Sequence, residues 1–238
     1  DIWKIDPSGE KVPVCITKAF GRRNKTRLRY LKLHPDEEYI PADEYRILRA
    51  FDERTMSSGF FSMRFGLVQN PELLLMDNYH FSDVQKAKEE DRLIWTRQNV
   101  RTFPDFWISD LDFGHSEKIS EANPQQDNYI WPTVELVEWT SFSGEKLKGL
   151  LYKPGNFDPE EKYPVMVYFY ERNAENLHRY QIPAPSRSTI NKTFYASNGY
   201  LVFVPDITYK VGYPGQGAYD AIVSGTQYLV NTRPYVDV

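Results

Sequence analysis

Serine is the first residue type to examine for chemistry in this 238-residue chain. A nucleophilic serine on a strained strand-to-helix turn carries the pattern G-x-S-x-G. That pattern does not occur in the sequence. Ser224, in "AIVSGT", lacks the leading glycine, and we interpret it as an ordinary helix residue. The sequence therefore shows no recognisable nucleophile of this kind.

Histidine and cysteine give no clearer site. No two histidines have the H-x-x-x-H spacing of a zinc site, and a single cysteine cannot form an intramolecular disulfide. The glycine-rich "GYPGQG" (212–217) lacks the lysine of a phosphate-binding loop and predicts a turn into a helix. We therefore expect neither a metal nor a cofactor. The residues considered are His34, His80, His115, His178 and Cys15.

Composition excludes some classes of partner. The net charge of −4 gives no reason to expect nucleic-acid binding, and no basic run suggests a membrane surface. No stretch approaches the ~20 apolar residues that span a bilayer. Cysteine usage leaves the compartment open. The opening "DIWKIDPSGE" is typical of a strand and its turn, so we expect an excerpt of a longer protein, cut at both ends.

The first half of the chain predicts antiparallel sheet. Short apolar or alternating runs are separated by charged, turn-prone segments such as "HPDEE" and "DERTMSSG". The predicted strands are "TRLRYLKL" (26–33), "YRILRAF" (45–51), "ELLLM" (72–76), "RLIWTRQNV" (92–100) and "DFWISDL" (105–111).

A weak repeat also runs through this half, from strand into acidic turn. Aligning Asp6, Asp52 and Asp112 gives separations of 46 and 60 residues. Propeller blades repeat every ~40–50 residues, and an insertion at 81–91 would explain the longer gap. A β-sandwich with chance similarity between its turns is the alternative.

The second half predicts a different order of elements, in which strands alternate with helices. The polar segment 123–136 indicates a connection, with a domain boundary near residue 130. Two strands joined at Ser143-Gly144-Glu145 come next, followed by the apolar run "VMVYFY" (165–170). We expect that run to be a strand covered on both faces. A helix in 186–199, capped by Ser188 or Thr189, a buried strand at 200–206 and a helix at 215–231 complete a β-α alternation typical of parallel sheet.

The segment "WTSFSGEKLKGLLYKPGNFDPEEKYPVMVYFYE" resembles the start of the catalytic domain in the prolyl oligopeptidase family of serine peptidases. Its glycine turn, "Y-x-P-x-x-F-D" loop, "K-Y-P" and hydrophobic strand follow the family's order, and "YLVFVPD" and "GYPGQG" continue it. "FWISDLDFGHSEKISEANPQ" is similar to the last propeller strands of this family. The closest branch resembles dipeptidyl-peptidase-IV-like and acylaminoacyl-peptidase-like enzymes.

The resemblance implies a mixed β and α/β chain. Residues 1–130 would form about two C-terminal blades of a β-propeller, and 131–238 the N-terminal part of an α/β-hydrolase domain. The serine, aspartate and histidine of the triad would all lie beyond Val238, since they follow later strands. The chain alone would be inactive, and its parent would cleave short peptides. A non-catalytic interaction module and an ester hydrolase of the same fold remain alternatives.

The resemblance also implies a role for Tyr170. Counting from Lys162-Tyr163-Pro164 places it where this branch has a tyrosine that serves the oxyanion hole. A phenol at a strand's carboxyl end can donate to a developing oxyanion. The alternative is a packing aromatic beside Tyr168, and alternation along one strand cannot decide, because both tyrosines would share a face.

Other charged segments carry less information. Glu171-Arg172-Asn173 could line an active-site rim or be solvated, and we interpret Asp36-Glu37-Glu38 as a solvated turn. The stretch "DITYKVGYPG" lacks the Arg-Gly-Ser that relatives often have after this strand, so no role is transferred to it. Open sheet edges in a partial propeller and a partial hydrolase predict that the isolated chain self-associates or is poorly stable. A homo-oligomer is a further expectation.

Overall fold

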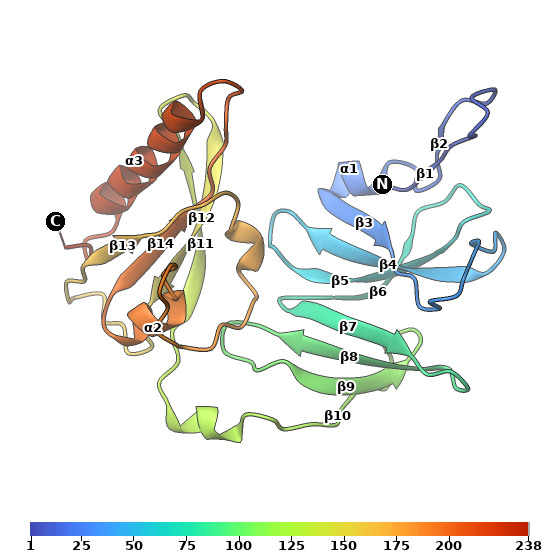
Figure 1. Ribbon diagram of the computed structural model, residues 1–238, viewed down its shortest axis with the longest axis horizontal. Helices are drawn as coiled ribbons and strands as arrows, with labels where there is room; N and C mark the ends of the chain where they lie inside the picture. Colours follow the sequence, from blue (N-terminus) through green and yellow to red (C-terminus); the bar gives the residue numbers. More distant parts are fainter. Residues whose placement is uncertain (238) are drawn as a thin grey trace. The chain divides into compact units, whose positions relative to one another are not determined.

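A computed structural model describes residues 1–237 (Figure 1). The chain divides into two compact units: the first comprises residues 1–99 and 104–122, and the second comprises 100–103 and the chain from 123 onward. Both are built mainly on β-sheet. None of the helices in residues 1–237 is long and apolar enough to cross a bilayer.

The first unit contains two four-stranded antiparallel sheets, each with its strands in chain order. A pair of two-residue antiparallel strands and the short helix α1 precede them. The pair is β1 (Trp3–Lys4) and β2 (Val14–Cys15), and α1 is Phe20–Asn24. The first sheet is β3 (Thr26–Tyr30), β4 (Tyr45–Asp52), β5 (Ser58–Arg64) and β6 (Glu72–Asp77). The second is β7 (His80–Lys86), β8 (Arg92–Gln98), β9 (Asp105–Asp110) and β10 (Glu117–Lys118).

The five predicted strands of this half correspond to β3, β4, β6, β8 and β9, and the antiparallel arrangement is confirmed. Strands β5 and β7 were not predicted. The segment at 58–64 is buried on both faces and begins with Ser58 and Gly59, so it lacks the alternation that marks a strand. Gly59 is needed there, because a Cβ would lie 2.0 Å from the carbonyl oxygen of Leu75.

Aromatic side chains form the core between the two sheets. Phe60 of β5 stacks on Phe113 with ring centroids 4.0 Å apart, and Phe81 of β7 contacts both Phe60 and Trp95. The indole of Trp95 is buried, and its N–H donates to Ser109 Oγ at 3.0 Å. These contacts join the two sheets into one unit.

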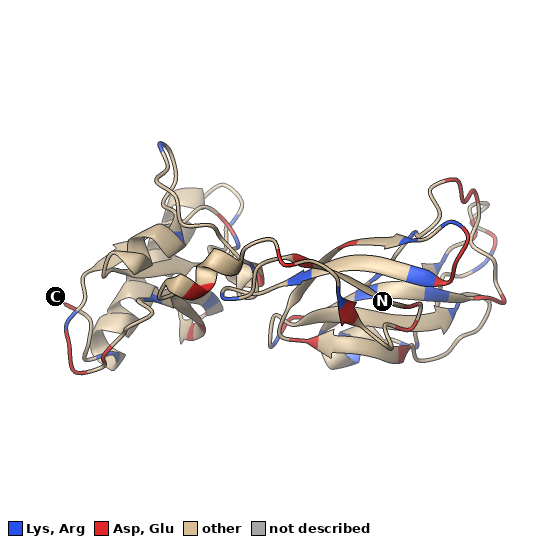
Figure 2. Ribbon diagram, turned by 90° about the horizontal axis from the view of Figure 1, so that it is seen from below, with Lys and Arg blue, Asp and Glu red and all other residues tan. Residues whose placement is uncertain are grey.

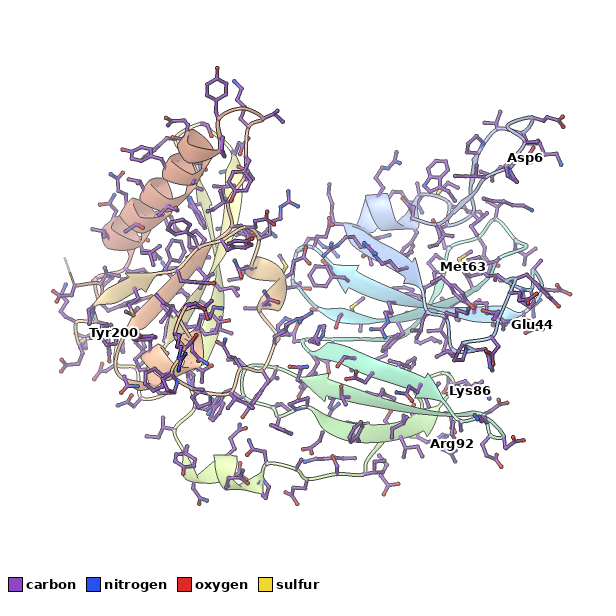
Figure 3. The ribbon with its side chains drawn as sticks, in the orientation of Figure 1. Asp6, Glu44, Met63, Lys86, Arg92 and Tyr200 are labelled. Carbon is purple, nitrogen blue, oxygen red and sulfur yellow. The ribbon has the colours of Figure 1, made fainter. Side chains whose placement is uncertain are left out.

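The predicted repeat is not a structural one. Asp52 ends the second strand of the first sheet, whereas Asp112 follows the third strand of the second sheet. The predicted insertion at 81–91 is also wrong, because His80–Lys86 is strand β7. Figure 3 labels Lys86 and Arg92, which flank the β7–β8 turn, where Lys86 pairs with Asp91 at 3.2 Å. Turn chemistry recurs at every hairpin, so similar acidic turns need not mark equivalent strands.

The interpretation of Asp36-Glu37-Glu38 as solvated is wrong for Glu37. Its side chain is only 11% exposed, accepts a hydrogen bond from the Tyr30 hydroxyl and pairs with Arg46 at 3.3 Å. Burial and, after it, the contact with Glu37 raise the pKa of Tyr30 to about 12. Basic and acidic residues are interspersed along the strands and turns of the first unit (Figure 2).

The second unit has one mixed sheet in the order β11-β12-β14-β13. The predicted hairpin is confirmed as β11 and β12, whose turn contains Gly144 with a φ of 85°. β12 is antiparallel to β14, and β13 is parallel to β14. The strands are β11 (Thr133–Thr140), β12 (Lys146–Lys153), β13 (Val165–Val167) and β14 (Leu201–Pro205).

Strand β13 is an edge strand, and its three residues are only half-buried. The expectation of a strand covered on both faces is therefore wrong for residues 165–170. It holds instead for β14, in which Leu201, Val202, Phe203 and Val204 are all fully buried. Strand order decides this difference, and strand order depends on contacts far apart in the sequence.

Helices α2 (Lys192–Ser197) and α3 (Pro214–Thr232) pack on opposite faces of this sheet (Figure 1). The cap of α2 is Asn191, whose side chain accepts from the Phe194 amide at 2.9 Å, so the predicted cap at Ser188 or Thr189 is wrong. The prediction for α3 is confirmed. Gly225 allows α3 to approach Trp139 closely, because a Cβ there would lie 2.9 Å from the indole ring.

Candidate functional site

Tyr170 lies just beyond the carboxyl end of β13. Regular pairing of β13 with β14 ends at Val167, and the Tyr168 amide makes one further hydrogen bond, to the Phe203 carbonyl at 2.9 Å. The chain then bends at Tyr170. The backbone of Tyr170 is therefore no longer held by the strand ladder itself.

Tyr168 and Tyr170 have different environments. Tyr168 is half-buried against the α2 side of the sheet, and the Lys192 ammonium lies 4.8 Å from its ring centroid. The Tyr170 side chain is 75% exposed. Strand alternation stops at the bend, so the two rings do not share a buried face. Tyr170 is consequently not a core aromatic within residues 1–237, and its hydroxyl is accessible to a ligand.

Three groups that follow β14 hold the loop after β13. The Tyr209 hydroxyl donates to the Tyr170 carbonyl at 2.8 Å, and the Ile207 amide donates to the Glu171 carbonyl at 3.0 Å. The Asp206 carboxylate accepts from the main-chain amides of Asn173 and Ala174, the latter at 2.9 Å. Three of the four residues in the segment 206–209 therefore fix the backbone around Tyr170.

Asp206 is the most perturbed acid of this site. Burial raises its pKa above the ordinary value of 3.8, and the two amide hydrogen bonds and Arg172 oppose the rise. Burial disfavours the charged form, whereas amide donors favour it. Keeping the buried carboxylate ionised therefore costs free energy, and this cost depends on pH.

We expect the stability contribution of Asp206 to rise on acidification. As the pH falls through the raised folded pKa towards 3.8, the folded state binds a proton that the unfolded state does not, so the free energy of unfolding rises. Below 3.8 both states are protonated and the gain is complete. Asp206→Asn keeps an oxygen acceptor and cannot titrate. Urea unfolding of the full-length protein at a series of pH values measures this. The free energy of unfolding of the wild type should increase relative to that of the variant as the pH falls. A difference independent of pH would contradict the assignment.

The neighbouring residues play different parts. Glu171 and Arg172 are exposed, whereas Asn173 is half-buried. Ser224 is a buried residue of α3 that accepts from the Trp139 indole N–H at 3.0 Å, which confirms its interpretation as a helix residue. Among residues 1–237, no three His, Cys, Asp or Glu side chains gather as a metal site would require.

The segment after α3 returns to the outer edge of β13. Tyr163, just before β13, forms an isolated parallel bridge with Val236. The Tyr163 amide donates to the Tyr235 carbonyl at 2.9 Å, and the Asp237 amide donates to the Tyr163 carbonyl at 3.0 Å. The direction of the chain at residues 235–237 is therefore the same as that of β13.

The proteins most similar to this chain in sequence and structure include several named dipeptidyl peptidases. No family model matches the sequence. Dipeptidyl peptidase 8 of Mus musculus is 27% identical over 193 residues, which cover 75% of this chain and 18% of the relative. Dipeptidyl-peptidase 5 of Porphyromonas endodontalis is 26% identical over 146 residues, covering 60% of this chain and 20% of the relative. The crystal structure of Porphyromonas gingivalis dipeptidyl peptidase 4 superposes with a TM-score of 0.61 at 18% identity, over 88% of this chain and 30% of that one.

The relatives support the resemblance of this chain to the prolyl oligopeptidase family. The resemblance predicted from residues 135–238 is thereby confirmed at the level of the family. The chain spans about a fifth of the length of the curated relatives it matches. Sequence reasoning missed Asp206 and Tyr209, which hold the loop after β13. The only signal for them was the "PDITY" that directly follows a buried strand.

Proposed function

We propose that this chain is part of a serine peptidase that cleaves short peptides in the manner of a dipeptidyl or acylaminoacyl peptidase. In this proposal, residues 1–130 are C-terminal blades of a β-propeller, and 131–238 open an α/β-hydrolase domain. The two four-stranded antiparallel sheets support the first part. The parallel pairing of β13 with β14, in a sheet that carries one helix on each face, supports the second.

The position of Val236 carries the proposal. A strand that continued from the bridge at Tyr163 would run parallel to β13 along its free edge. Carboxyl ends of parallel strands meet at one edge of a sheet, and ligands bind there in open α/β folds. A nucleophile turn after such a strand would therefore form beside Tyr170, which already lies past the carboxyl end of β13.

The chemistry of the proposed site is acyl transfer. The serine, aspartate and histidine would come from residues beyond Val238, in the chain order that α/β-hydrolases use. The oxyanion of the tetrahedral intermediate would be stabilised by two donors, the amide after the serine and the Tyr170 hydroxyl. Asp206 and Tyr209 would act as positioning residues, because they hold the backbone of 170–174 and touch no reacting atom.

The proposal is tested on the longer protein that carries this sequence. A fluorophosphonate probe, which labels activated serines, should modify one serine, and peptide mapping should place it after residue 238 within a G-x-S-x-G turn. The labelled protein should lose its activity on dipeptide and aminoacyl chromogenic substrates. Labelling with hydrolysis of simple esters alone would favour an esterase, and the absence of any labelled serine would favour an interaction module.

The proposal that further strands extend the sheet of the second unit also predicts how residues 1–238 behave when expressed alone. β13 presents an open edge on which Tyr163 alone is bridged, and open edges are templates for pairing. We expect residues 1–238 expressed alone to self-associate or melt without cooperativity. Sedimentation velocity and thermal unfolding check this together. A monodisperse monomer with a high, cooperative transition would contradict it.

A further inference from the structure

A small cavity lies on the α2 face of the second unit's sheet. Its volume is about 190 Å³. Strands β12 and β14 form its floor with Leu150 and Val204, and Lys192 at the start of α2 lies on its wall. We call it the Lys192 cavity. It is too small for a drug-sized ligand, and its occupant must be small.

The charge of the Lys192 cavity has one sign. Lys192 and Arg179 line it, and no aspartate or glutamate does. Neither cation takes part in an ion pair with another residue of 1–237. The pKa of Lys192 is lowered by burial, and no carboxylate opposes that shift. A half-buried ammonium without a counter-charge is costly, and a bound anion would offset that cost.

The tyrosine Tyr152 adds an independent observation. Tyr152 of β12 is only 4% exposed, lines the Lys192 cavity, and has no hydrogen-bond partner for its hydroxyl among residues 1–237. Burial alone raises its pKa, so the phenol stays protonated and can donate. The side chains of Asn173, Asn176 and Gln181 also line the cavity, and their amides can donate.

We propose that the Lys192 cavity binds a small carboxylate that carries a short apolar stem. Lys192, Arg179 and the Tyr152 hydroxyl would hold the carboxylate, since a guanidinium and an ammonium both bind it well. Leu150, Val204 and the Tyr152 ring would contact the stem. A fully hydrated oxoanion such as phosphate fits less well, because it would place polar oxygens against this apolar floor.

Two sources could supply such a carboxylate, the free carboxyl end of a peptide and a free short-chain acid. Calorimetric titrations of the full-length protein at constant ionic strength would compare N-acetyl-alanine, butyrate and inorganic phosphate. Tighter binding of N-acetyl-alanine assigns a peptide terminus, and tighter binding of butyrate assigns a free acid. Phosphate binding more tightly than both would overturn the carboxylate proposal, as would the absence of saturable binding.

Variants locate the binding in the Lys192 cavity. Lys192→Gln should raise the Kd of the better carboxylate at least tenfold, and Tyr152→Phe, which keeps the ring, should raise it about threefold or more. Arg187→Gln is the matched control, because it removes the same charge from an exposed position outside the cavity and should leave the Kd unchanged. Unchanged binding by Lys192→Gln, or equal loss in Arg187→Gln, would overturn the site. Thermal melts without ligand confirm that each variant is folded.

Discussion

Tyr170→Phe should lower kcat of the full-length protein by ~10²-fold or more with little change in KM, because it would remove one of the two proposed oxyanion donors. The substitution removes the hydroxyl and keeps the ring. Because the ring is 75% exposed, little packing is at stake, and the melting temperature should not change. The loss therefore falls on stabilisation of the transition state. Steady-state kinetics with dipeptide and aminoacyl chromogenic substrates measure it.

Tyr168→Phe is the control for this experiment. It makes the same chemical change two residues earlier, but Tyr168 is half-buried on the α2 face beside Lys192. We expect its turnover to stay close to that of the wild type. If Tyr170→Phe turns over normally, or if both variants lose activity equally, Tyr170 is not the oxyanion donor. The family resemblance would then stand without an identified catalytic residue in this chain.

Phe203→Ala should cost about 3–5 kcal/mol in the free energy of unfolding, which is typical for removing a buried phenylalanine. Phe203 is fully buried in β14, the strand covered on both faces. Its ring meets the Trp139 indole edge-on with centroids 5.5 Å apart, and it lies close to Gly225 of α3. The cavity left would open between the sheet and α3. Denaturant unfolding of the full-length protein, monitored by tryptophan fluorescence, measures the change.

Phe142→Ala provides the comparison, since it removes the same ring from a position that is 53% exposed. Its only ring contact among residues 1–237 is with Tyr219, at a centroid distance of 6.3 Å. We expect it to cost less than about 1 kcal/mol, as surface substitutions do. Equal losses in the free energy of unfolding for Phe142→Ala and Phe203→Ala would contradict the assignment of Phe203 to the core of the second unit.

Much of the fold could be predicted because its signals are local. Gly144 marks the turn between β11 and β12, and the apolar spacing of 215–231 matches α3. The change from antiparallel to parallel strands was visible in the spacing of apolar runs. Strands β5 and β7 were missed because burial on both faces, or an interrupted alternation, erases the two-residue period.

The candidate site was only partly predictable. Family resemblance singled out Tyr170 by counting from "K-Y-P", but it could not show that Asp206 and Tyr209 hold the surrounding loop. Those contacts join residues more than thirty positions apart, and no periodic pattern reports them. Glu37 was misjudged for a similar reason, because its burial depends on Tyr30 and Arg46 from neighbouring strands.

The sequence by itself determined the class of the sheets, the hairpin and α3, the family resemblance, and the absence of a G-x-S-x-G turn in these residues. Each of these depends on residue types within one short window. Only the tertiary structure decided that β14 and not β13 is covered on both faces, and that Tyr168 and Tyr170 part at a bend. It also decided that Lys192, Arg179 and Tyr152 line one cavity. The physical reason is that burial and charge pairing are set by which strands become neighbours, and strand order is a property of the whole folded sheet.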